Sequence, residues 1–394
     1  MGSLFRPPGY GDEAFRKRFL RRQRRQLVWQ AAVLALVVAV LWYFAGNIAS
    51  NLASHGIRSG FGFLSDRSSF EIGESLVTVT SQDSFARMFL AGVLNTLRVA
   101  AVSIVTASLL GLAVGVMRLS RHGLLRFLGA AHVELYRNVP LLIQLFTVYL
   151  VITEFLPDIF EPLTLGSWVM LSKSGFFIAC PEHLALANAA AAVLALAAAA
   201  AVYRSGMKTF TREVAVFRAS VVFGVLFCAV WLASGLFGIS APQLDGFAVE
   251  GGIAMTPEFI ALWTGLTLFT SASIAEIVRA GILTVGRNQQ MAGRALGLTD
   301  SQVLSNIILP QSLKLVVPPL ASQYMNLTKN SSLAVIIGYP DIVNIGNTSI
   351  VIMGQALEAI LIIMSVYLTI NLAIALAMGA LNTRINAPTQ RGIR

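Results

Sequence analysis

The sequence has little charge and almost no cysteine. Only 12% of its 394 residues are charged, about half the share usual in a soluble domain, whereas 56% are hydrophobic. The mean hydropathy is +0.72. A chain with so few polar groups could not cover its apolar surface in water. These proportions exclude a purely soluble enzyme and predict an integral membrane protein.

Residues that carry chemistry are equally sparse. The two cysteines, Cys180 and Cys228, fall in a predicted outside loop and a predicted span, and they form no zinc or redox spacing. The four histidines are scattered, so no metal site is predicted. The sequence contains no GxxxxGK[ST], GxSxG or HExxH motif, the patterns typical of nucleotide or peptide hydrolysis. The chain thus has no visible means of hydrolysing a nucleotide or a peptide by itself, which favours a protein that is not an enzyme and binds no cofactor itself.

Long uncharged runs predict the membrane topology. A hydrocarbon core about 30 Å thick needs roughly 20 apolar residues per helix. Five runs reach about that length, and three shorter runs become spans if their flanking charges reach an interface or a protein-lined cavity. The five are 26–54, 99–117, 184–203, 219–244 and 359–383, and the three are 138–153, 259–275 and 315–328. The sequence thus predicts an all-α integral membrane protein with about eight transmembrane helices.

The positive charges predict the orientation, because short cytoplasmic loops retain Lys and Arg. With the N-terminus inside, 23 of the 29 Lys and Arg residues fall in inside segments, whereas most acids fall outside. The formal charge of +10 is then a topology signal. The basic arm 16–25 is expected to lie near anionic lipid head groups rather than to bind nucleic acid. Both termini are predicted to be cytoplasmic.

Residues 286–312 form an unusually long connector between the sixth and seventh predicted spans. Its first part, 290–296, predicts a short helix that Gly297 closes at a position suited to positive φ. Thr299 or Asp300 can cap a second helix, which begins at Ser301 and is expected to end at Pro310. Two short helices joined at a glycine predict a compact cytoplasmic knob. Its small residues would let another protein approach the backbone, and they are Ala292, Gly293 and Ala295.

This connector resembles the cytoplasmic coupling loop of binding-protein-dependent ABC transporter permeases. The pattern of that family is Glu-Ala-Ala, three residues, Gly, nine residues, Ile, one residue, Leu-Pro. Every spacing is present here, although Met replaces the Glu and Gly replaces the second Ala. The matching residues are Met291, Ala292, Gly293, Gly297, Ile307, Leu309 and Pro310, and Ala295 and Leu296 belong to the same stretch.

Four further stretches resemble the polar amino acid subfamily of these permeases, and they are 94–97, 134–142, 275–282 and 329–333. The resemblance covers 87–155 and 256–385, which implies a five-helix core of the type I ABC importer fold. The remaining parts are a basic arm, first span and outside segment (1–86), an insertion with two spans (156–255) and a tail (386–394). These extra parts resemble the larger permease subunits of general L-amino acid transporters, the Aap/Bzt type.

The resemblance implies a permease subunit that takes up L-amino acids across a bacterial inner membrane. It implies a second, homologous permease as partner, a periplasmic amino acid binding protein, and an ATPase dimer that holds ATP and Mg. Hydrolysis in that ATPase would be coupled to transport through residues 289–310.

A path for an amino acid needs polar groups at membrane depth. The candidates are Asn95, Thr96, Arg98, Gln144, Ser271, Ser273, Glu276, Gln323, Asn326, Lys329 and Ser331. For Glu276 an ion pair with Arg279 at the end of a span is the favoured interpretation. The seventh span is expected to be irregular at Pro318-Pro319 and around 330–332, which is tolerated where backbone lines a cavity or is buried.

Two other classes stay open. An ion-coupled secondary transporter would keep the polar residues, but it would work without ATP and usually has repeated halves. An integral-membrane enzyme should present paired catalytic acids, histidines or metal ligands. Neither class explains the 286–312 loop.

Overall fold

The computed structural model describes residues 13–54, 60–207, 212–235, 238–246 and 248–390, and these are mostly helical. The helices are α1 Glu13–Ser54, α2 Phe85–Leu119, α3 Gly123–Asn138, α4 Leu141–Leu150, α5 Leu184–Gly206, α6 Arg212–Ser234, α7 Pro257–Thr284, α8 Arg287–Ala295, α9 Asp300–Val303, α10 Leu309–Asn330, α11 Ile342–Met353 and α12 Ala356–Gln390. Short 3₁₀ turns form η1 Phe61–Ser65 and η5 Ser331–Ile337, and π-helical turns form η2 Val151–Phe155 and η4 Leu304–Ile308.

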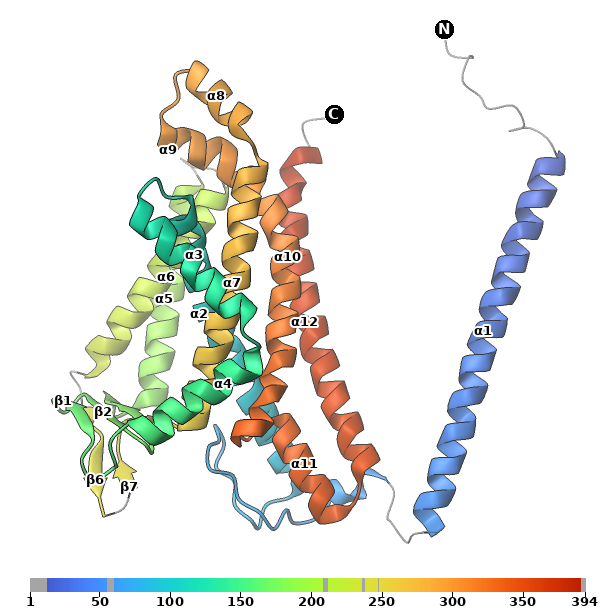
Figure 1. Cartoon of the computed structure of the whole chain (residues 1–394), viewed down its shortest axis with the longest axis vertical. Coiled ribbons are helices and arrows are strands. Elements are labelled where there is room, and N and C mark those ends of the chain that lie inside the picture. The colour runs from blue at the N-terminus through green and yellow to red at the C-terminus, as the bar shows by residue number, and fades with distance from the viewer. Residues whose placement is uncertain (1–12, 55–59, 208–211, 236–237, 247, 391–394) are drawn as a thin grey trace.

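Helices α2, α7, α10 and α12 form the main bundle, and α1 runs apart from it in Figure 1. Helices α8 and α9 project from one end of this bundle, which we call the loop end. The first residues of α1 and the last turns of α12 lie at the same end (Figure 1). Helix α11 and the strands lie at the opposite end, which we call the sheet end.

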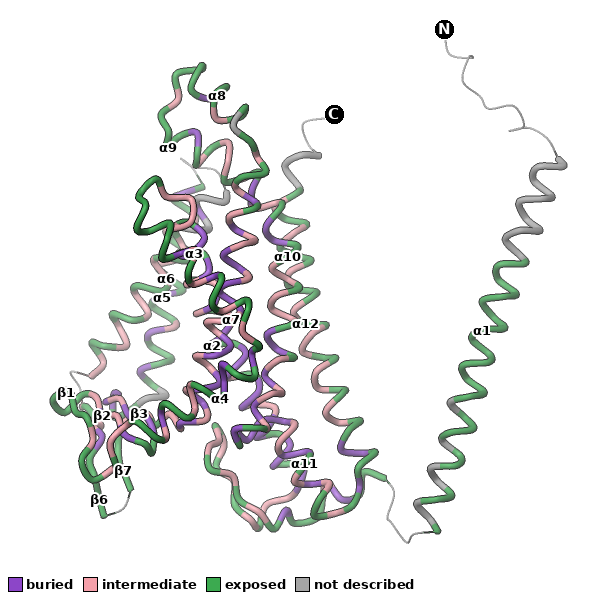
Figure 2. The backbone as a smooth tube through the Cα atoms, in the orientation of Figure 1, coloured by how far each residue is buried: buried purple, intermediate pink, exposed green. Residues whose placement is uncertain are grey.

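The core of the bundle is the crossing of α2 and α7. A Cβ atom added to Gly111 would lie 2.7 Å from Ile274 Cβ, and one added to Gly115 would lie 3.0 Å from the Ala275 carbonyl oxygen. Glycines four residues apart let two helix backbones approach closely in a membrane protein. Buried residues accordingly line α2 and α7, whereas the residues of α1 whose burial is described, from Arg25 on, are exposed (Figure 2).

The insertion adds short antiparallel strands, which the sequence did not predict, to this mostly helical fold. They are β1 Leu163–Leu165, β2 Val169–Ser172, β3 Gly175–Ile178, β4 Cys180–Pro181, β5 Ile239–Ser240, β6 Gln243–Asp245, β7 Ala248–Glu250 and β8 Ile253–Met255. The largest sheet has the order β1-β2-β3-β8, and Phe176 of β3 pairs with Met255 of β8. Burial alternates along β2 and β3, as expected for strands with one packed face. These strands are too short to give a clear periodic signal in the sequence.

The expected count of eight spans is not confirmed. Within the described residues, six helices are long and apolar enough to cross a membrane, or seven if α3 and α4–η2, bent by 103°, are taken together. The expected span 138–153 is the second half of that bent pair, because the chain turns at Pro140. The expected span 219–244 is shorter than predicted, because α6 ends at Ser234 and β5 starts at Ile239. The chain is a multi-pass membrane protein.

The seventh expected span is irregular at only one of the two expected positions. Pro318 and Pro319 lie inside the continuous helix α10, and the helix changes to a 3₁₀ turn at Ser331. Prolines are tolerated in membrane helices where neighbouring groups compensate for the missing backbone hydrogen bond.

Candidate functional site

The first helix of the 286–312 loop is closed as the sequence predicts. Helix α8 follows Gly286, and Gly297 adopts a φ of +81° just after its C-terminus. The Gly297 N–H donates to the Arg294 carbonyl at 2.9 Å, and the Leu298 N–H donates to the Gly293 carbonyl at 3.2 Å. This pair of bonds is the Schellman arrangement, which satisfies the last carbonyls of a helix. The glycine therefore fixes the direction in which the chain leaves α8.

The second helix begins as predicted but does not end at Pro310. The Thr299 N–H donates to Gln302 Oε1 at 2.9 Å, and the Thr299 hydroxyl accepts from the Gln302 N–H, so the two residues form a capping box. Helix α9 then passes through the π-helical turn η4 directly into α10. Pro310 lies just after η4, and the wider π-helical turn lets the helix continue past a residue that has no backbone N–H. Residues 300–330 thus form one unbroken helical rod.

Helix α8 packs against this rod through Gly293, which is buried rather than on the exposed surface. A Cβ atom at Gly293 would lie 2.8 Å from Val303 Cγ2 and 3.0 Å from Ile307 Cδ1. Arg294 Nε donates to Asp300 Oδ1 at 2.8 Å across the same junction. The expectation that Gly293 lets another protein approach the backbone was wrong, because this glycine faces the rod. Its small size instead determines how closely α8 approaches the rod.

Apolar side chains cover the outside of the loop. Met291 is 59% exposed, Leu296 80% and Leu309 40%, and the exposed Ala292 and Ala295 lie beside them. Exposed apolar patches on a protein commonly mark a surface that binds another protein. Among the residues that match the family pattern, Gly293 is buried and Ile307 and Pro310 are half-buried, whereas the others are exposed and available for contact.

At the sheet end, α2 carries three of the polar residues expected to line a path. Asn95 is fully buried, and its Nδ2 donates to the Glu74 carbonyl at 2.8 Å and to the Pro340 carbonyl at 3.0 Å. Thr96 is also buried, and its hydroxyl accepts from the Ile342 N–H at 3.1 Å. These bonds attach α2 to the turn before α11.

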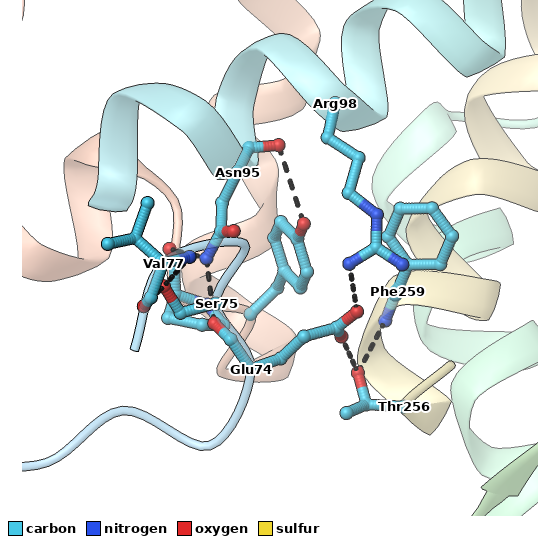
Figure 3. Close-up of polar contacts among 9 residues, drawn as sticks. Glu74, Ser75, Val77, Asn95, Arg98, Thr256 and Phe259 are labelled. Carbon is cyan, nitrogen blue, oxygen red and sulfur yellow. Dashed lines mark hydrogen bonds and ion pairs between the residues drawn. The ribbon is translucent and has the colours of Figure 1, made fainter. Parts of the chain in front are cut away.

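Arg98 lies one helical turn from Asn95 and pairs with Glu74 (Figure 3). Arg98 Nη1 donates to Glu74 Oε1, and the Thr256 hydroxyl donates to Glu74 Oε2. The guanidinium carbon also lies 4.2 Å from the centroid of the Phe259 ring, within the range of a cation–π contact. Arg98 and Glu74 are only 18% and 10% exposed, so the ion pair is largely withdrawn from solvent.

Tyr339 closes the inner side of this cluster. Its hydroxyl donates to the Asn95 carbonyl at 3.4 Å, and its ring centroid lies 6.0 Å from that of Phe259. Burial raises the pKa of the Tyr339 hydroxyl, so the group stays protonated and can act as a donor.

Sequence reasoning missed Glu74. The residue lies in an irregular segment that carries no helical or strand period, and it meets Arg98 across 24 positions of the chain. An unpaired Arg98 beside the uncharged run 99–117 was the one available signal, because a cation at that position needs a partner.

The other polar candidates lie elsewhere. Gln144 Nε2 donates to the Tyr136 carbonyl at 2.9 Å and to the Val139 carbonyl at 2.8 Å, which fixes the bend between α3 and α4. The Ser331 hydroxyl donates to the Thr328 carbonyl at 2.7 Å. Ser273 and Gln323 are half-buried, and Asn326 and Lys329 are exposed.

The predicted Glu276–Arg279 ion pair is confirmed and has a third member. Arg279 Nη2 lies 2.7 Å from Glu276 Oε1, and Arg118 Nη1 donates to Glu276 Oε2. Nearby, Ser271 Oγ on α7 lies 2.9 Å from His132 Nε2 on α3. Glu276 therefore joins α2 to α7 towards the loop end, as Glu74 joins them at the sheet end.

Comparisons with known proteins agree with the family resemblance of the 286–312 loop. The family model described as "Binding-protein-dependent transport system inner membrane component" matches residues 216–387. The chain is 40% identical to the "Putative amino-acid ABC transporter permease protein YhdX" of Escherichia coli (strain K12) over 363 residues, covering 90% of this chain and 92% of that protein.

Two further relatives cover nearly the whole chain. The "General L-amino acid transport system permease protein AapQ" of Rhizobium johnstonii is 37% identical, with 94% of this chain and 95% of that protein covered. The "Glutamate/glutamine/aspartate/asparagine transport system permease protein BztB" of Rhodobacter capsulatus is 32% identical, with 92% and 93% covered. None of these relatives supports the alternative of a secondary transporter. The chain belongs to the family of binding-protein-dependent ABC transporter permeases, and it is a transport subunit rather than an enzyme.

Proposed function

We propose that this permease takes up L-amino acids across a bacterial inner membrane, driven by ATP hydrolysis in a separate ATPase that docks on the 286–312 loop. The printed names of three relatives, all amino acid permeases, support the substrate class. The substrates in these names range from general L-amino acids to glutamate, glutamine, aspartate and asparagine. This range supports a permease that recognises features common to amino acids.

The observation that carries the proposal is the continuous rod from Asp300 to Asn330 with α8 packed on its first turns. A movement imposed on the loop would be passed to α10 without an intervening flexible joint. ATP binding would close the ATPase dimer and pull on the exposed apolar surface around Met291 and Leu296. The core helices would then change from inward-facing to outward-facing.

The same arrangement supports the partners that we propose. The start of α1 and the last turns of α12 lie at the loop end (Figure 1). This placement is in keeping with cytoplasmic termini and with the excess of Lys and Arg predicted there. An ATPase dimer, which holds ATP and Mg, would dock at the loop end. A periplasmic amino acid binding protein would dock at the sheet end, and a second, homologous permease would complete the membrane unit within the lipid.

The test is amino acid uptake by the complete transporter in proteoliposomes, with and without the ATPase. Uptake should require the ATPase, and Gly297→Asp should reduce uptake by about tenfold or more while ATP hydrolysis continues. The physical reason is that a side chain at a φ of +81° is strained and redirects the chain after α8. Gly123→Asp is the matched control, because Gly123 is an exposed glycine at the start of α3 with open space around it.

Uptake that persists without the ATPase would contradict the proposal. So would wild-type uptake by the Gly297→Asp variant.

A further inference from the structure

Arg98 is a cation in a position where a cation is costly. It directly precedes the uncharged run 99–117 and is 18% exposed. A buried or membrane-embedded cation is retained only with an anionic partner, and such residues commonly lie on substrate paths. Phe259 covers one face of the guanidinium, so the group is held in a fixed position.

The partner of Arg98 comes from a loop rather than from a core helix. Backbone hydrogen bonds close the base of this loop: Ser69 N–H donates to the Ser81 carbonyl at 3.0 Å, and Phe85 N–H donates to the Asp66 carbonyl at 3.0 Å. Glu74 lies near the middle of the enclosed residues 70–80. Phe70, Ile72 and Val79 pack against the core, so the part that can withdraw while the base stays attached to α2 is the short segment 73–77, which includes Glu74.

Glu74 holds the cluster through two different groups. Its carboxylate accepts from Arg98 and Thr256, and its backbone carbonyl accepts from Asn95 Nδ2. Withdrawal of this one residue would free the Arg98 guanidinium and one of the two Asn95 N–H donors, one helical turn apart on α2, while Asn95 stays bonded to the Pro340 carbonyl.

We propose that Arg98 is a binding site for the carboxylate of the transported substrate, and that Glu74 occupies this site in the present conformation. The inference rests on the proposed function for its substrate class, an α-amino acid. A substrate carboxylate would replace the Glu74 carboxylate, so that the Arg98 guanidinium remains paired with an anion before and after the exchange. That exchange avoids the cost of leaving a buried charge alone.

Asn95 provides a second contact suited to an amino acid. Its Oδ1 is buried and accepts no hydrogen bond from the residues that the structure describes. A buried acceptor without a donor is unfavourable and is uncommon in native proteins. An ammonium group would satisfy it, and an α-amino acid carries its ammonium one carbon away from its carboxylate. Arg98 and Asn95 together thus match both charges of the zwitterion.

The experiment measures binding to the permease–ATPase complex in nanodiscs without the binding protein. The probes are radiolabelled L-glutamine and, as competitor, L-glutaminamide, which lacks only the α-carboxylate. Glu74→Gln removes the competing carboxylate and should tighten L-glutamine binding by about threefold or more, because a larger fraction of the sites is open. Arg98→Lys keeps the charge but loses the planar fork, and it should weaken binding by about tenfold.

The controls repeat the two chemical changes at exposed charged side chains that contact neither this cluster nor the 70–80 loop. Glu161→Gln in the insertion and Arg126→Lys on α3 should leave L-glutamine binding unchanged. L-glutaminamide should compete poorly in every variant.

The proposal is overturned if Glu74→Gln binds L-glutamine no more tightly than the wild type, or if L-glutaminamide competes as well as unlabelled L-glutamine. It is also overturned if neither the wild-type nor the Glu74→Gln complex binds L-glutamine. In each case the Glu74–Arg98 pair is only a structural tie. Should Arg98→Lys fail to assemble, the Glu74→Gln and competitor results still decide. ATP-dependent uptake by the same wild-type preparation is measured separately, so failure of this inference is distinct from failure of the proposed function.

Discussion

Gly293 is one of the two residues at which this loop departs from its family pattern, and the structure gives a reason for it. Its α-carbon faces Val303, a buried β-branched residue with little freedom to move. An alanine here would place its Cβ atom 2.8 Å from Val303 Cγ2. The glycine therefore matches a helix junction that is closer than alanine allows.

We predict that Gly293→Ala loosens the loop. Overpacking of a close junction costs about 1–3 kcal/mol, and here the cost would separate α8 from the rod. Limited trypsin digestion of the complex should cut faster at Arg294, and ATP-coupled uptake should fall. Adding Val303→Ala makes room for the new methyl group and should restore the wild-type cleavage rate.

Gly224→Ala serves as the control, because a Cβ atom there meets nothing within 4 Å. A single Gly293→Ala variant that resists trypsin as well as the wild type would contradict the close junction.

Individual residues were predictable where a local rule applies. Gly297 could be assigned a positive φ from its place after a short helix, and Glu276 could be paired with Arg279 because they lie one turn apart. The partners Arg118 and Glu74 come from distant parts of the chain. No local pattern specifies such a contact, because it depends on how the helices pack.

At the scale of elements, the α2–α7 crossing depends on small residues in the middle of both helices. Gly111 lies against Ile274, and the Ser271 carbonyl oxygen would lie 2.9 Å from a Cβ atom at this position. A backbone atom cannot rotate away as a side chain can, so any substitution must push the helices apart.

We predict that Gly111→Ala lowers the thermal stability of the purified permease complex, by about 1–3 kcal/mol from overpacking. The melting temperature in detergent is the measurement. Gly379→Ala, in the open and exposed part of α12, should leave it unchanged or raise it slightly, because alanine favours a helix more than glycine does. Equal melting temperatures for the wild type and Gly111→Ala would show that α2 and α7 do not cross at this glycine.

Helix ends were harder to predict than helix existence. The sequence places a stop at Pro310 because a proline normally interrupts the hydrogen bonds of the preceding turn. The π-helical turn at 304–308 lets the helix continue instead, and Gln311 Nε2 donates to the Ile307 carbonyl at 2.9 Å beside it. Such a turn has no composition of its own, so the continuous rod became visible only in the structure.

At the scale of the whole molecule, composition and charge were sufficient to predict a multi-pass membrane protein. The loop pattern was sufficient to identify its family, as the relatives confirm. The strands of the insertion were not predictable, because each contains only two to four residues and because β3–β8 and β4–β5 join segments far apart in the sequence. The span count failed for a related reason, since uncharged runs do not reveal a bend such as that between α3 and α4.

The insertion contains a helical hairpin that can be tested as a unit. Helices α5 and α6 make their main contacts with each other and with β4, and the buried faces between them are alanines, among them Ala187, Ala191 and Ala195. Small residues four positions apart let the two helices pack closely without help from the core. At the base of the hairpin, Pro181 of β4 pairs with Ile239 of β5, so the two chain ends that flank it are adjacent.

We predict that replacing residues 182–238 by a short Gly/Ser linker leaves the permease core folded. A linker of about four residues can join paired antiparallel strands. The β1-β2-β3-β8 sheet should remain, because its strands lie outside the deleted segment. Assembly with the partner subunits, followed by size-exclusion chromatography, and ATP-driven L-glutamine uptake are the two measurements, and both should stay close to those of the intact chain. A shortened chain that assembles but no longer transports would instead mean that α5 and α6 take part in the translocation path. A shortened chain that fails to assemble would mean that the hairpin is part of a subunit interface.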